Sequence, residues 1–558
     1  MQHSGPIAGI AAQGNLIATA GYDNRLILWD ARQRQALACS SHDHLVNQCS
    51  FSSDGRWLVS ASSDYSARIW QLPSLRLHVV LGGHEDDVDM AVFSPDDSLI
   101  ATCALDRCVR IFNRDGLCLH VMHGHTGNVL SLAWMRDGQR LVSSSVDGTI
   151  RLWDARSGVQ LQCTDLAIRS DSVEIDANGV IFAGDDLGRI AMIGDGSLHF
   201  VAAHQAGIKK LVLDERQGVL VTLSYDRSLA VWRYTDKKQL QLQARTTLPA
   251  PVWARAAAVL ADGSVATGTF GGSYAVYDPQ TDSWDMQGVQ AGPGINALLY
   301  QAGHLYSVGD AGEVRRDGQL LAGMGSLCNF LVSADNHLLT GGQLGQLFDA
   351  QSGQLLYQHH SPLNCAVTFC KDKTWHCAVG SYTGEILVFA LQAEGKWQRV
   401  QQLQVYQNAI KGLAYSEGVL FSVCASTAVS WHAVNDWSLQ QQVAHGHQRI
   451  ANDCCAIGPG VFASISRDRK LRLWHGDTVE CFDSPHPNSI KCLAINQAGN
   501  TLLTGSYGGT LALFDLQQKC WQPMQRPTIA GISDITWLDD QHCFVAASYD
   551  GQLHRIEA

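Results

Sequence analysis

Histidine, a hydroxyl residue and aspartate recur along the chain at regular spacing, and these residue types could perform nucleophilic catalysis. One set consists of His125, Ser143 and Asp147. In a catalytic triad the histidine takes the hydroxyl proton, and the carboxylate orients the imidazole ring. Here the set returns in at least five segments, whereas one active site requires only one copy. We therefore interpret these residues as bracing that each segment needs for itself, and we expect no catalytic residue among them.

The sets lie within a longer repeat. The segment 124–158 matches 83–116 and 203–236, and the same pattern returns at 446–477 and 486–515. Each copy reads as short alternating strands separated by turn residues such as SPDD, RDG and VDG. Marked by their turns, fourteen copies share the 558 residues. A period of about 40 to 45 residues with four strands per copy is typical of a β-propeller.

The GH and WD signatures of these copies resemble those of WD-repeat proteins, and the resemblance covers nearly the whole chain. A single ring of fourteen blades would leave a poorly filled centre, because propellers usually have about 4 to 8 blades. The expected fold is therefore all-β, a tandem pair of seven-bladed β-propellers built from fourteen four-stranded WD-type repeats. This architecture is similar to that of the actin-interacting WD-repeat proteins.

We expect the rings to occupy residues 1–285 and 286–558, because the stretch near 280–293 collects turn formers and lacks the strand pattern. Ala558 follows the third predicted strand of the last copy directly, and about five residues precede the first strand. The usual closure, in which one terminus completes the blade of the other, is therefore in question. A three-stranded last blade and an interlocked pair of rings are both compatible with the sequence.

The resemblance implies a structural role for the repeated polar sets, each of which ends with a tryptophan. In WD-repeat proteins these four side chains form a hydrogen-bonded chain that ties an outer loop to two strands and gives each buried polar group a partner. The clearest sets are His125, Ser143, Asp147 and Trp153; His204, Thr222, Asp226 and Trp232; and His447, Ser464, Asp468 and Trp474.

Composition limits the classes of partner. The formal net charge is -12, which argues against nucleic-acid binding. No stretch has the roughly 18 apolar residues that cross a bilayer, and the N-terminus lacks the pattern of a secretory signal, so we expect no membrane insertion. The 17 cysteines are scattered without CxxC pairs, which favours reduced thiols in the cytoplasm.

One group of possible metal ligands stands out in a single copy of the repeat. It comprises His359, His360, Cys365, Cys370, His376 and Cys377. Zinc binds such residues, but their spacing fits no zinc finger, and two of the cysteines fall within strand patterns, where cysteine is commonly a small buried apolar residue. We therefore expect no metal and no cofactor.

Partner contacts in WD-repeat proteins often involve the rim residue before the turn aspartate and the residues that open the first strand of a blade. Exposed aromatic residues beside lysine or arginine are typical of binding hot spots, although a tyrosine can also simply cover a strand edge. Carried onto this sequence, the two positions select Tyr22, Tyr225, Phe270, Trp253, Tyr382, Lys411, Asn452, Arg467, Lys491, Tyr507 and Tyr549. Further strand-opening residues are Asp89, Lys209, Asn296 and Ser533.

Three hypotheses for function follow. The favoured one is a non-catalytic scaffold that assembles proteins or peptides through the propeller rims. Its mouth in the second ring, with Lys411, Arg467 and Lys491, could attract an acidic peptide or a small anion. The alternatives are a small-molecule- or metal-binding propeller with a catalytic or accessory role in a biosynthetic pathway, and a cytoskeletal role like that of the actin-interacting relatives.

Overall fold

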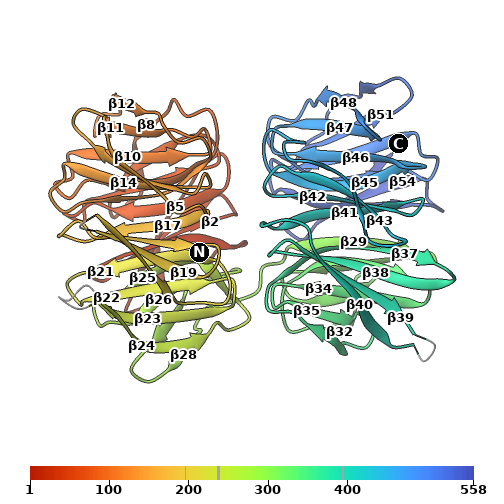
Figure 1. Cartoon of the computed structure of the whole chain (residues 1–558), viewed down its shortest axis with the longest axis horizontal. Coiled ribbons are helices and arrows are strands. Elements are labelled where there is room, and N and C mark those ends of the chain that lie inside the picture. The colour runs from red at the N-terminus through yellow and green to blue at the C-terminus, as the bar shows by residue number, and fades with distance from the viewer. Residues whose placement is uncertain (195, 235–238, 393–394, 558) are drawn as a thin grey trace. The chain divides into compact units, whose positions relative to one another are not determined.

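The computed structural model describes residues 1–194, 196–234, 239–392 and 395–557. These residues form fourteen antiparallel sheets and contain no helix (Figure 1). Within the same ranges, thirteen sheets have four strands and the last has three. The chain divides into two compact units, Met1–Ala291 and Gly292–Ala558. The prediction of an all-β pair of seven-bladed propellers is confirmed, with the correction that the fourteenth described sheet has three strands rather than four.

The sheets of the first unit each consist of four consecutive strands, numbered from the inside of the ring outward. They are β1 (Ile7–Gln13), β2 (Leu16–Gly21), β3 (Arg25–Asp30), β4 (Gln35–Ser41); β5 (Val46–Phe51), β6 (Trp57–Ser62), β7 (Ala67–Gln71), β8 (Arg76–Leu81); β9 (Val88–Phe93), β10 (Leu99–Ala104), β11 (Val109–Asn113), β12 (Cys118–Met122); β13 (Val129–Trp134), β14 (Arg140–Ser145), β15 (Thr149–Asp154), β16 (Gln160–Asp165); β17 (Ser170–Ile175), β18 (Ile181–Asp185), β19 (Arg189–Gly194), β20 (Ser197–Ala202); β21 (Ile208–Asp214), β22 (Val219–Ser224), β23 (Ser228–Tyr234), β24 (Leu240–Thr247); β25 (Val252–Val259), β26 (Val265–Thr269), β27 (Ala275–Asp278) and β28 (Ser283–Asp285).

The second unit repeats this order. Its strands are β29 (Ile295–Gln301), β30 (His304–Gly309), β31 (Glu313–Arg316), β32 (Gln319–Gly323); β33 (Cys328–Ala334), β34 (His337–Gly342), β35 (Gln346–Asp349), β36 (Leu355–Gln358); β37 (Leu363–Lys371), β38 (Thr374–Ser381), β39 (Glu385–Leu391), β40 (Trp397–Gln404); β41 (Ile410–Ser416), β42 (Val419–Cys424), β43 (Val429–Ala433), β44 (Leu439–Val443); β45 (Ala451–Gly458), β46 (Val461–Ser466), β47 (Lys470–His475), β48 (Thr478–Asp483); β49 (Ile490–Ile495), β50 (Thr501–Ser506), β51 (Leu511–Asp515), β52 (Cys520–Trp521); β53 (Ile532–Leu538), β54 (Cys543–Ser548) and β55 (Leu553–Glu557).

The apolar core of each unit lies between neighbouring sheets. In the first unit one cluster joins the seventh sheet to the first, where Trp29 meets Tyr274 at 5.8 Å between ring centroids. In the second unit the corresponding cluster joins Leu298 of the first sheet to Leu538 and Val545 of the last. Each ring therefore closes on itself by packing of side chains, and every sheet is built from consecutive strands of one unit. Among the described residues no strand of one unit completes a sheet of the other, and the last sheet has three strands.

The two ends of the first ring are also joined by polar contacts. The backbone N–H groups of His3 and Gly272 each donate to the carbonyl of the other, both at 2.9 Å. The guanidinium of Arg34 donates to the carbonyl of Tyr274 at 3.0 Å and lies over its ring. Residues 286–291, expected in the second ring, belong to the first unit, where Met286 and Val289 pack on its last sheet.

A β-bulge at the second residue of the innermost strand recurs around each ring. In the β41–β42 pair, for example, the register passes from Ile410 to Gly412 and leaves Lys411 unpaired. A bulge redirects a side chain relative to the regular alternation of the strand. Because all seven innermost strands of the second unit share it, one side chain from each blade occupies an equivalent place around the centre.

Candidate functional site

The repeated histidine sets form the hydrogen-bonded chains that the sequence suggests. In the β13–β16 sheet, Nδ1 of His125 lies 2.9 Å from Asp147, and its Nε2 lies 2.8 Å from the hydroxyl of Ser143. The indole N–H of Trp153 donates to the same hydroxyl at 2.8 Å. Equivalent chains join His204, Thr222, Asp226 and Trp232 in the β21–β24 sheet.

In each of these hydrogen-bonded sets the aspartate carboxylate is ionised. Burial alone would raise the pKa of Asp147, but hydrogen bonds from His125, from the Thr149 hydroxyl and backbone, and from the Thr126 backbone outweigh burial and lower it. The Ser143 hydroxyl is fully buried and already contacts both His125 and Trp153. With no solvent access and both partners in place, the hydroxyl is positioned to brace the blade rather than to attack a substrate.

The set in the β45–β48 sheet departs from this pattern. Ser464 still joins His447 and Trp474, each at 2.8 Å. However, Nδ1 of His447 is 4.0 Å from Asp468, because the guanidinium of Arg472 contacts that nitrogen at 2.9 Å and the carboxylate at 2.8 Å. Burial, with the Arg472 charge nearby, lowers the pKa of His447 to about 3, so this histidine is neutral.

The seven bulge residues of the second unit form a ring that we call the bulge ring. Five of them donate a side-chain hydrogen bond to the carbonyl of the first residue of the next innermost strand. The Nδ2 of Asn452, for example, donates to Ile490 at 2.5 Å. The other four donors are Asn296, Asn329, Asn364 and Ser533. These short side chains therefore link consecutive blades. The amide of Asn452 makes this hydrogen bond within the ring and is not directed to a partner.

Lys411 and Lys491 interrupt the bulge ring. They occupy the two remaining positions, on either side of Asn452. Among the described residues, neither ammonium group has an ion pair, although both side chains are partly accessible. Burial and the nearby charges of Lys491 and Arg467 lower the pKa of Lys411 to about 8. The pKa of Lys491 shifts the other way, because, although burial opposes the rise, Tyr549, Tyr507 and Asp453 raise it.

Aromatic rings flank the two lysines. The Lys411 ammonium lies 5.1 Å from the centroid of Tyr382, and the Arg467 guanidinium lies 5.8 Å from that of Tyr507. Tyr507 and Tyr549 stack with their centroids 6.3 Å apart. All of these rings are partly exposed. The structure therefore brings most of the residues chosen in the second ring into one cationic and aromatic mouth, which we call the second mouth.

Carboxyl groups of the second mouth do not neutralise it fully at pH 7. Burial raises the pKa of Asp453 to about 7 although Lys491 opposes the rise, and burial raises that of Asp534 to about 6. Asp310 is raised to about 7 for the same reason. All three accept hydrogen bonds from backbone or amide groups of neighbouring strands. At pH 7 about half of Asp453 and of Asp310 is protonated, whereas Asp534 is mostly ionised, so these carboxyl groups offset the three cations of the mouth only in part.

The corresponding aromatic residues of the first unit behave differently. Trp253 lies between Tyr22 and Phe270, with ring centroids at 5.3 and 5.8 Å. Phe270 is only 5% exposed, so its ring supports Trp253 and is not available to a partner. Tyr225 lies beneath the Lys209 ammonium, which is 4.7 Å from the ring centroid of the tyrosine. The burial of Phe270 thus reduces the expected aromatic patch.

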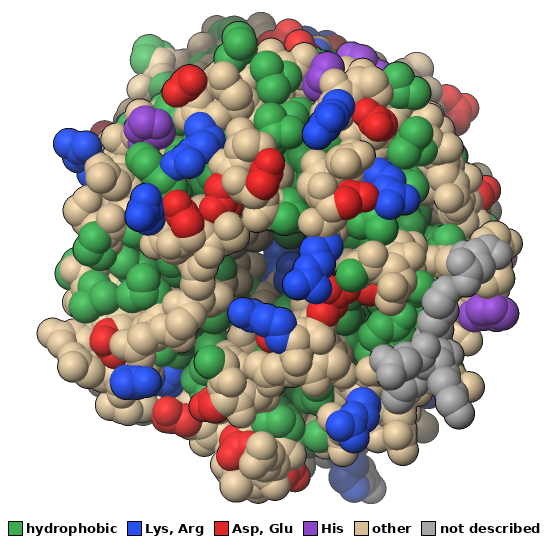
Figure 2. Space-filling view, turned by 90° about the vertical axis from the view of Figure 1, so that its left-hand side faces the viewer, with side chains coloured by type: hydrophobic (Ala, Val, Ile, Leu, Met, Phe, Trp, Pro, Cys, Tyr) green, Lys and Arg blue, Asp and Glu red, His purple; other side chains and the backbone are tan. Residues whose placement is uncertain are grey.

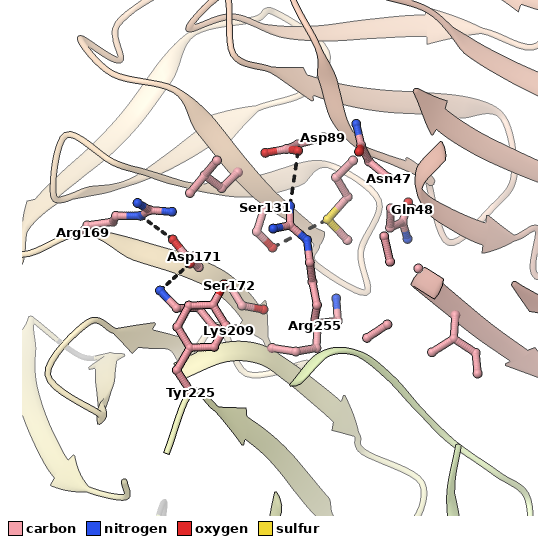
Figure 3. Close-up of a pocket in the computed structure, with 17 residues that line it drawn as sticks. Asn47, Gln48, Asp89, Ser131, Arg169, Asp171, Ser172, Lys209, Tyr225 and Arg255 are labelled. Atoms are coloured by element: carbon pink, nitrogen blue, oxygen red, sulfur yellow. Dashed lines mark hydrogen bonds and ion pairs between the residues drawn. The ribbon is translucent and has the colours of Figure 1, made fainter. Parts of the chain in front are cut away.

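Lysine and arginine side chains gather around a central hollow of the first unit (Figure 2). Figure 3 shows that acidic side chains pair with them. Lys209 contacts Asp171 and Asp186 at 2.8 and 2.6 Å, and Arg169 contacts Asp171 at 2.6 Å. Although burial opposes it, these carboxylates raise the pKa of Lys209 above its usual value.

The same figure shows Arg255 directed toward Asp89, at 3.9 Å. The cavity between these residues has a volume of about 90 Å³. A water needs roughly 10–15 Å³ in this measure, so the cavity has room for several waters. Its charges are largely matched within the ring, in contrast to those of the second mouth.

Family comparisons agree with this architecture. The model described as "WD domain, G-beta repeat" matches residues 1–30, 34–71, 75–113, 116–154 and 478–515. The model described as "WD40 repeated domain" matches residues 348–484, and the two together cover more than half of the chain. The chain belongs to the WD-repeat family.

Among curated WD-repeat relatives, a guanine nucleotide-binding protein subunit beta of Oryza sativa subsp. indica is 29% identical over 136 residues, which is 21% of this chain and 35% of that protein. The same subunit of Arabidopsis thaliana is 27% identical over 247 residues, 40% of this chain and 55% of that protein. WD repeat-containing protein 55 of Pongo abelii is 21% identical over 184 residues, 32% of this chain and 48% of that protein. Each match thus spans about a third to a half of the relative's length.

Two further observations concern this WD-repeat chain as a whole. Among the described residues, no helix has the length and apolar character needed to cross a membrane. The possible metal ligands singled out in the sequence are not brought together, since Cys377 is fully buried and its neighbour His376 directs its Nδ1 to the carbonyl of Thr374. Only His359 and His360 of that group come close together with a third ligand type, the carboxylate of Glu385.

Sequence reasoning missed Asp453, Asp534, Asn329, Asn364 and Glu385. The first four had a signal in the sequence. They lie just after the first apolar residue of a predicted inner strand, and these positions are equivalent in every copy of the repeat. Reading all seven positions together would have set the two lysines against a background of asparagine and serine. Glu385 also had a signal in the repeat, because it takes the place of Thr149, two residues after the turn, and Thr149 contacts the histidine of its own blade, His125, at 3.2 Å.

Proposed function

We propose that this WD-repeat protein is an interaction platform that binds acidic segments of partner proteins at the second mouth. The observation that carries the proposal is the interruption of the bulge ring by Lys411 and Lys491. Five equivalent positions use a short side chain to join blades, whereas these two place ammonium groups without an ion pair in the described structure. Removing two cations from water is costly unless they gain a compensating negative partner.

The surroundings of the lysines support a peptide ligand. Tyr382, Tyr507 and Tyr549 offer partly exposed rings beside the positive groups. Aromatic and arginine side chains of this kind are enriched in binding hot spots. The chain as a whole has a net charge of -12, so a local positive mouth would steer an acidic segment to this place.

The small-molecule alternative places its site in the mouth of the second ring, and the first unit adds no support for such a site elsewhere. The cavity of the first unit, of about 90 Å³, is well below the roughly 300–1,000 Å³ of typical ligand pockets. Membership of the WD-repeat family supports protein binding in general. The proposed platform role applies this general support to the present chain.

The test is affinity purification of the tagged full chain from its own host at moderate salt, followed by mass spectrometry. A Lys411→Glu, Lys491→Glu variant reverses the charge of the second mouth. The matched control is Lys470→Glu, Lys519→Glu, which makes the same charge change at lysines outside the mouth that pair with Asp483 and Glu480. We expect stoichiometric proteins to accompany the wild type and the control but not the mouth variant.

A direct measurement follows on the purified chain. A fluorescent Asp- and Glu-rich peptide should bind the wild type and the control with an affinity that falls as salt rises, because ions screen partly exposed charges. A peptide of the same length with Asn and Gln in place of the acids should bind far more weakly. The proposal fails if the wild type purifies alone and binds no acidic peptide, or if the mouth variant retains its partners and peptide affinity.

A further inference from the structure

Two histidines and a glutamate meet in the second unit, at the start of the β37–β40 sheet. His359 and His360 follow strand β36, and Glu385 begins strand β39. The Nε2 of His359 lies 3.1 Å from Oε2 of Glu385, and the Nε2 of His360 lies 3.9 Å from the same oxygen. His359 and Glu385 are 4% and 6% exposed, whereas the His360 ring reaches solvent.

This sheet lacks the hydrogen-bonded chain that braces the intact blades. Counted from the turn that strands β14–β15 and β38–β39 share, Val379 takes the place of Ser143, and Phe389 takes that of Trp153. His359 therefore has no hydroxyl partner, and its buried Nε2 faces the carboxylate of Glu385 at 3.1 Å instead. A carboxylate beside two imidazoles is a set of ligand types that a transition metal binds.

The other ring nitrogen of His359 faces the backbone of Ser361. Nδ1 lies 3.0 Å from the carbonyl of Ser361 and 3.2 Å from the N–H of that residue. When Nδ1 donates to the carbonyl, Nε2 has a lone pair directed toward Glu385, which is the form in which an imidazole binds a metal. In the other form Nε2–H donates to Glu385 and no ion is needed, and the test below separates the two. Donation from the second ring nitrogen to a backbone carbonyl is also the usual support of a metal-binding histidine.

The carboxylate is held in position by neighbours of its own. The Thr383 hydroxyl donates to Oε2 at 2.6 Å, and the Gln402 amide donates to Oε1 at 2.6 Å. Zinc with bond lengths of about 2.0–2.2 Å separates adjacent tetrahedral ligand atoms by about 3.3–3.6 Å. The observed separations of 3.1 and 3.9 Å bracket this spacing, and the three ligand atoms all lie within 4.8 Å of one another.

We infer that His359, His360 and Glu385 bind a divalent transition metal such as Zn²⁺ through Nε2, Nε2 and Oε2. Three protein ligands leave a fourth position on the solvent side, next to the exposed His360, for water or for a ligand from outside. The ion takes over the bracing that Ser143, Asp147 and Trp153 provide in an intact blade, because it ties the loop after β36 to strand β39. The inference does not depend on the second mouth or on any partner.

The test uses the reduced full chain with its exposed thiols alkylated, so that cysteine does not compete for metal. Titration with CoCl₂ should show one Co²⁺ per chain, with visible d–d bands and no sulfur-to-cobalt charge-transfer band. ZnCl₂ should displace the cobalt and raise the melting temperature. His360→Ala removes an exposed ligand without disturbing the core, and Glu385→Gln keeps the shape of the buried side chain. Each should weaken binding at least about tenfold.

The matched control is His475→Ala, because His475 also faces a glutamate, Glu480 at 3.2 Å, but belongs to no cluster of three possible ligands among the described residues. This variant should bind cobalt like the wild type. Absence of stoichiometric cobalt binding would overturn the inference and leave a simple His359–Glu385 pair. Binding that survives both His360→Ala and Glu385→Gln would overturn it as well, because the metal would then lie elsewhere.

Discussion

Removing the hydroxyl of Ser143 should destabilise the first propeller strongly. This hydroxyl contacts the Nε2 of His125 and the indole N–H of Trp153, each at 2.8 Å, and all three groups are buried. Ser143→Ala leaves two buried polar groups without a partner. A buried polar group that loses its partner costs about 1–3 kcal/mol, so with two such groups the free energy of unfolding should fall by about 2–6 kcal/mol.

The next residue offers a control within the same strand. Ser144 is also fully buried, but its hydroxyl has no hydrogen-bond partner among the described residues. Ser144→Ala therefore removes the same atom from the same strand without breaking a hydrogen bond. We expect a change of less than about 1 kcal/mol, which could be stabilising because an unsatisfied buried hydroxyl disappears.

Differential scanning calorimetry of the full chain measures both variants, with each unit allowed its own transition. A unit of 291 residues shifts its melting temperature by roughly 2 °C per kcal/mol, so Ser143→Ala should lower the first unit's transition by roughly 4–12 °C. Hydrogen exchange should show the loss of protection centred on β14 and β15. Equal shifts in melting temperature for the two variants, or no shift for Ser143→Ala, would refute the bracing role of the hydrogen-bonded set of His125, Ser143 and Trp153.

Three further outcomes are expected. Lys411→Met should weaken binding of the acidic peptide yet stabilise the protein at pH 7 by about 1–2 kcal/mol. The stabilisation should fade by pH 10, because the folded pKa of Lys411, about 8, lies below its unfolded value. Urea denaturation at both pH values measures the change in the free energy of unfolding. Asp453 has a folded pKa of about 7, above its unfolded value, so its contribution to stability falls as pH rises from about 4 to 7; Asp453→Asn should therefore gain stability relative to wild type between pH 5 and pH 8, and an unchanged difference in melting temperature would contradict this. Under native conditions a thiol reagent should modify the exposed cysteines first, and peptide mapping should locate the label on Cys39, Cys163, Cys370, Cys481 and Cys520. Rapid labelling of the buried cysteines would show instead that the core opens readily.

Much of the fold could be predicted from the sequence because each repeat carries its own instructions. The set of His125, Ser143, Asp147 and Trp153 lies within one blade, so its spacing along the chain almost defines its geometry. The end of the first unit was harder to place. Met286 and Val289 have no strand pattern, and only their packing on the last sheet assigns them to the first ring.

The binding residues were predicted less completely than the repeat. Tyr507 and Tyr549 do meet, as expected for neighbouring blades. Phe270, selected by the same rule, is buried, and its side chain packs against that of Trp253. The exposure of an aromatic residue depends on which neighbouring side chain covers it. Asn452 was selected as a contact residue, but its amide bonds the next blade.

The sequence by itself determined the all-β class, the period of the repeat and the residues that brace each blade, because these depend on interactions among residues about 20 positions apart. Only the tertiary structure decided which polar side chains have partners. Lys411 and Lys491 are conspicuous because five other blades place asparagine or serine at the same bulge, and they come together only because neighbouring blades pack side by side. Such pairings arise from the packing of blades into a ring, which brings distant segments to one place and which no local pattern records.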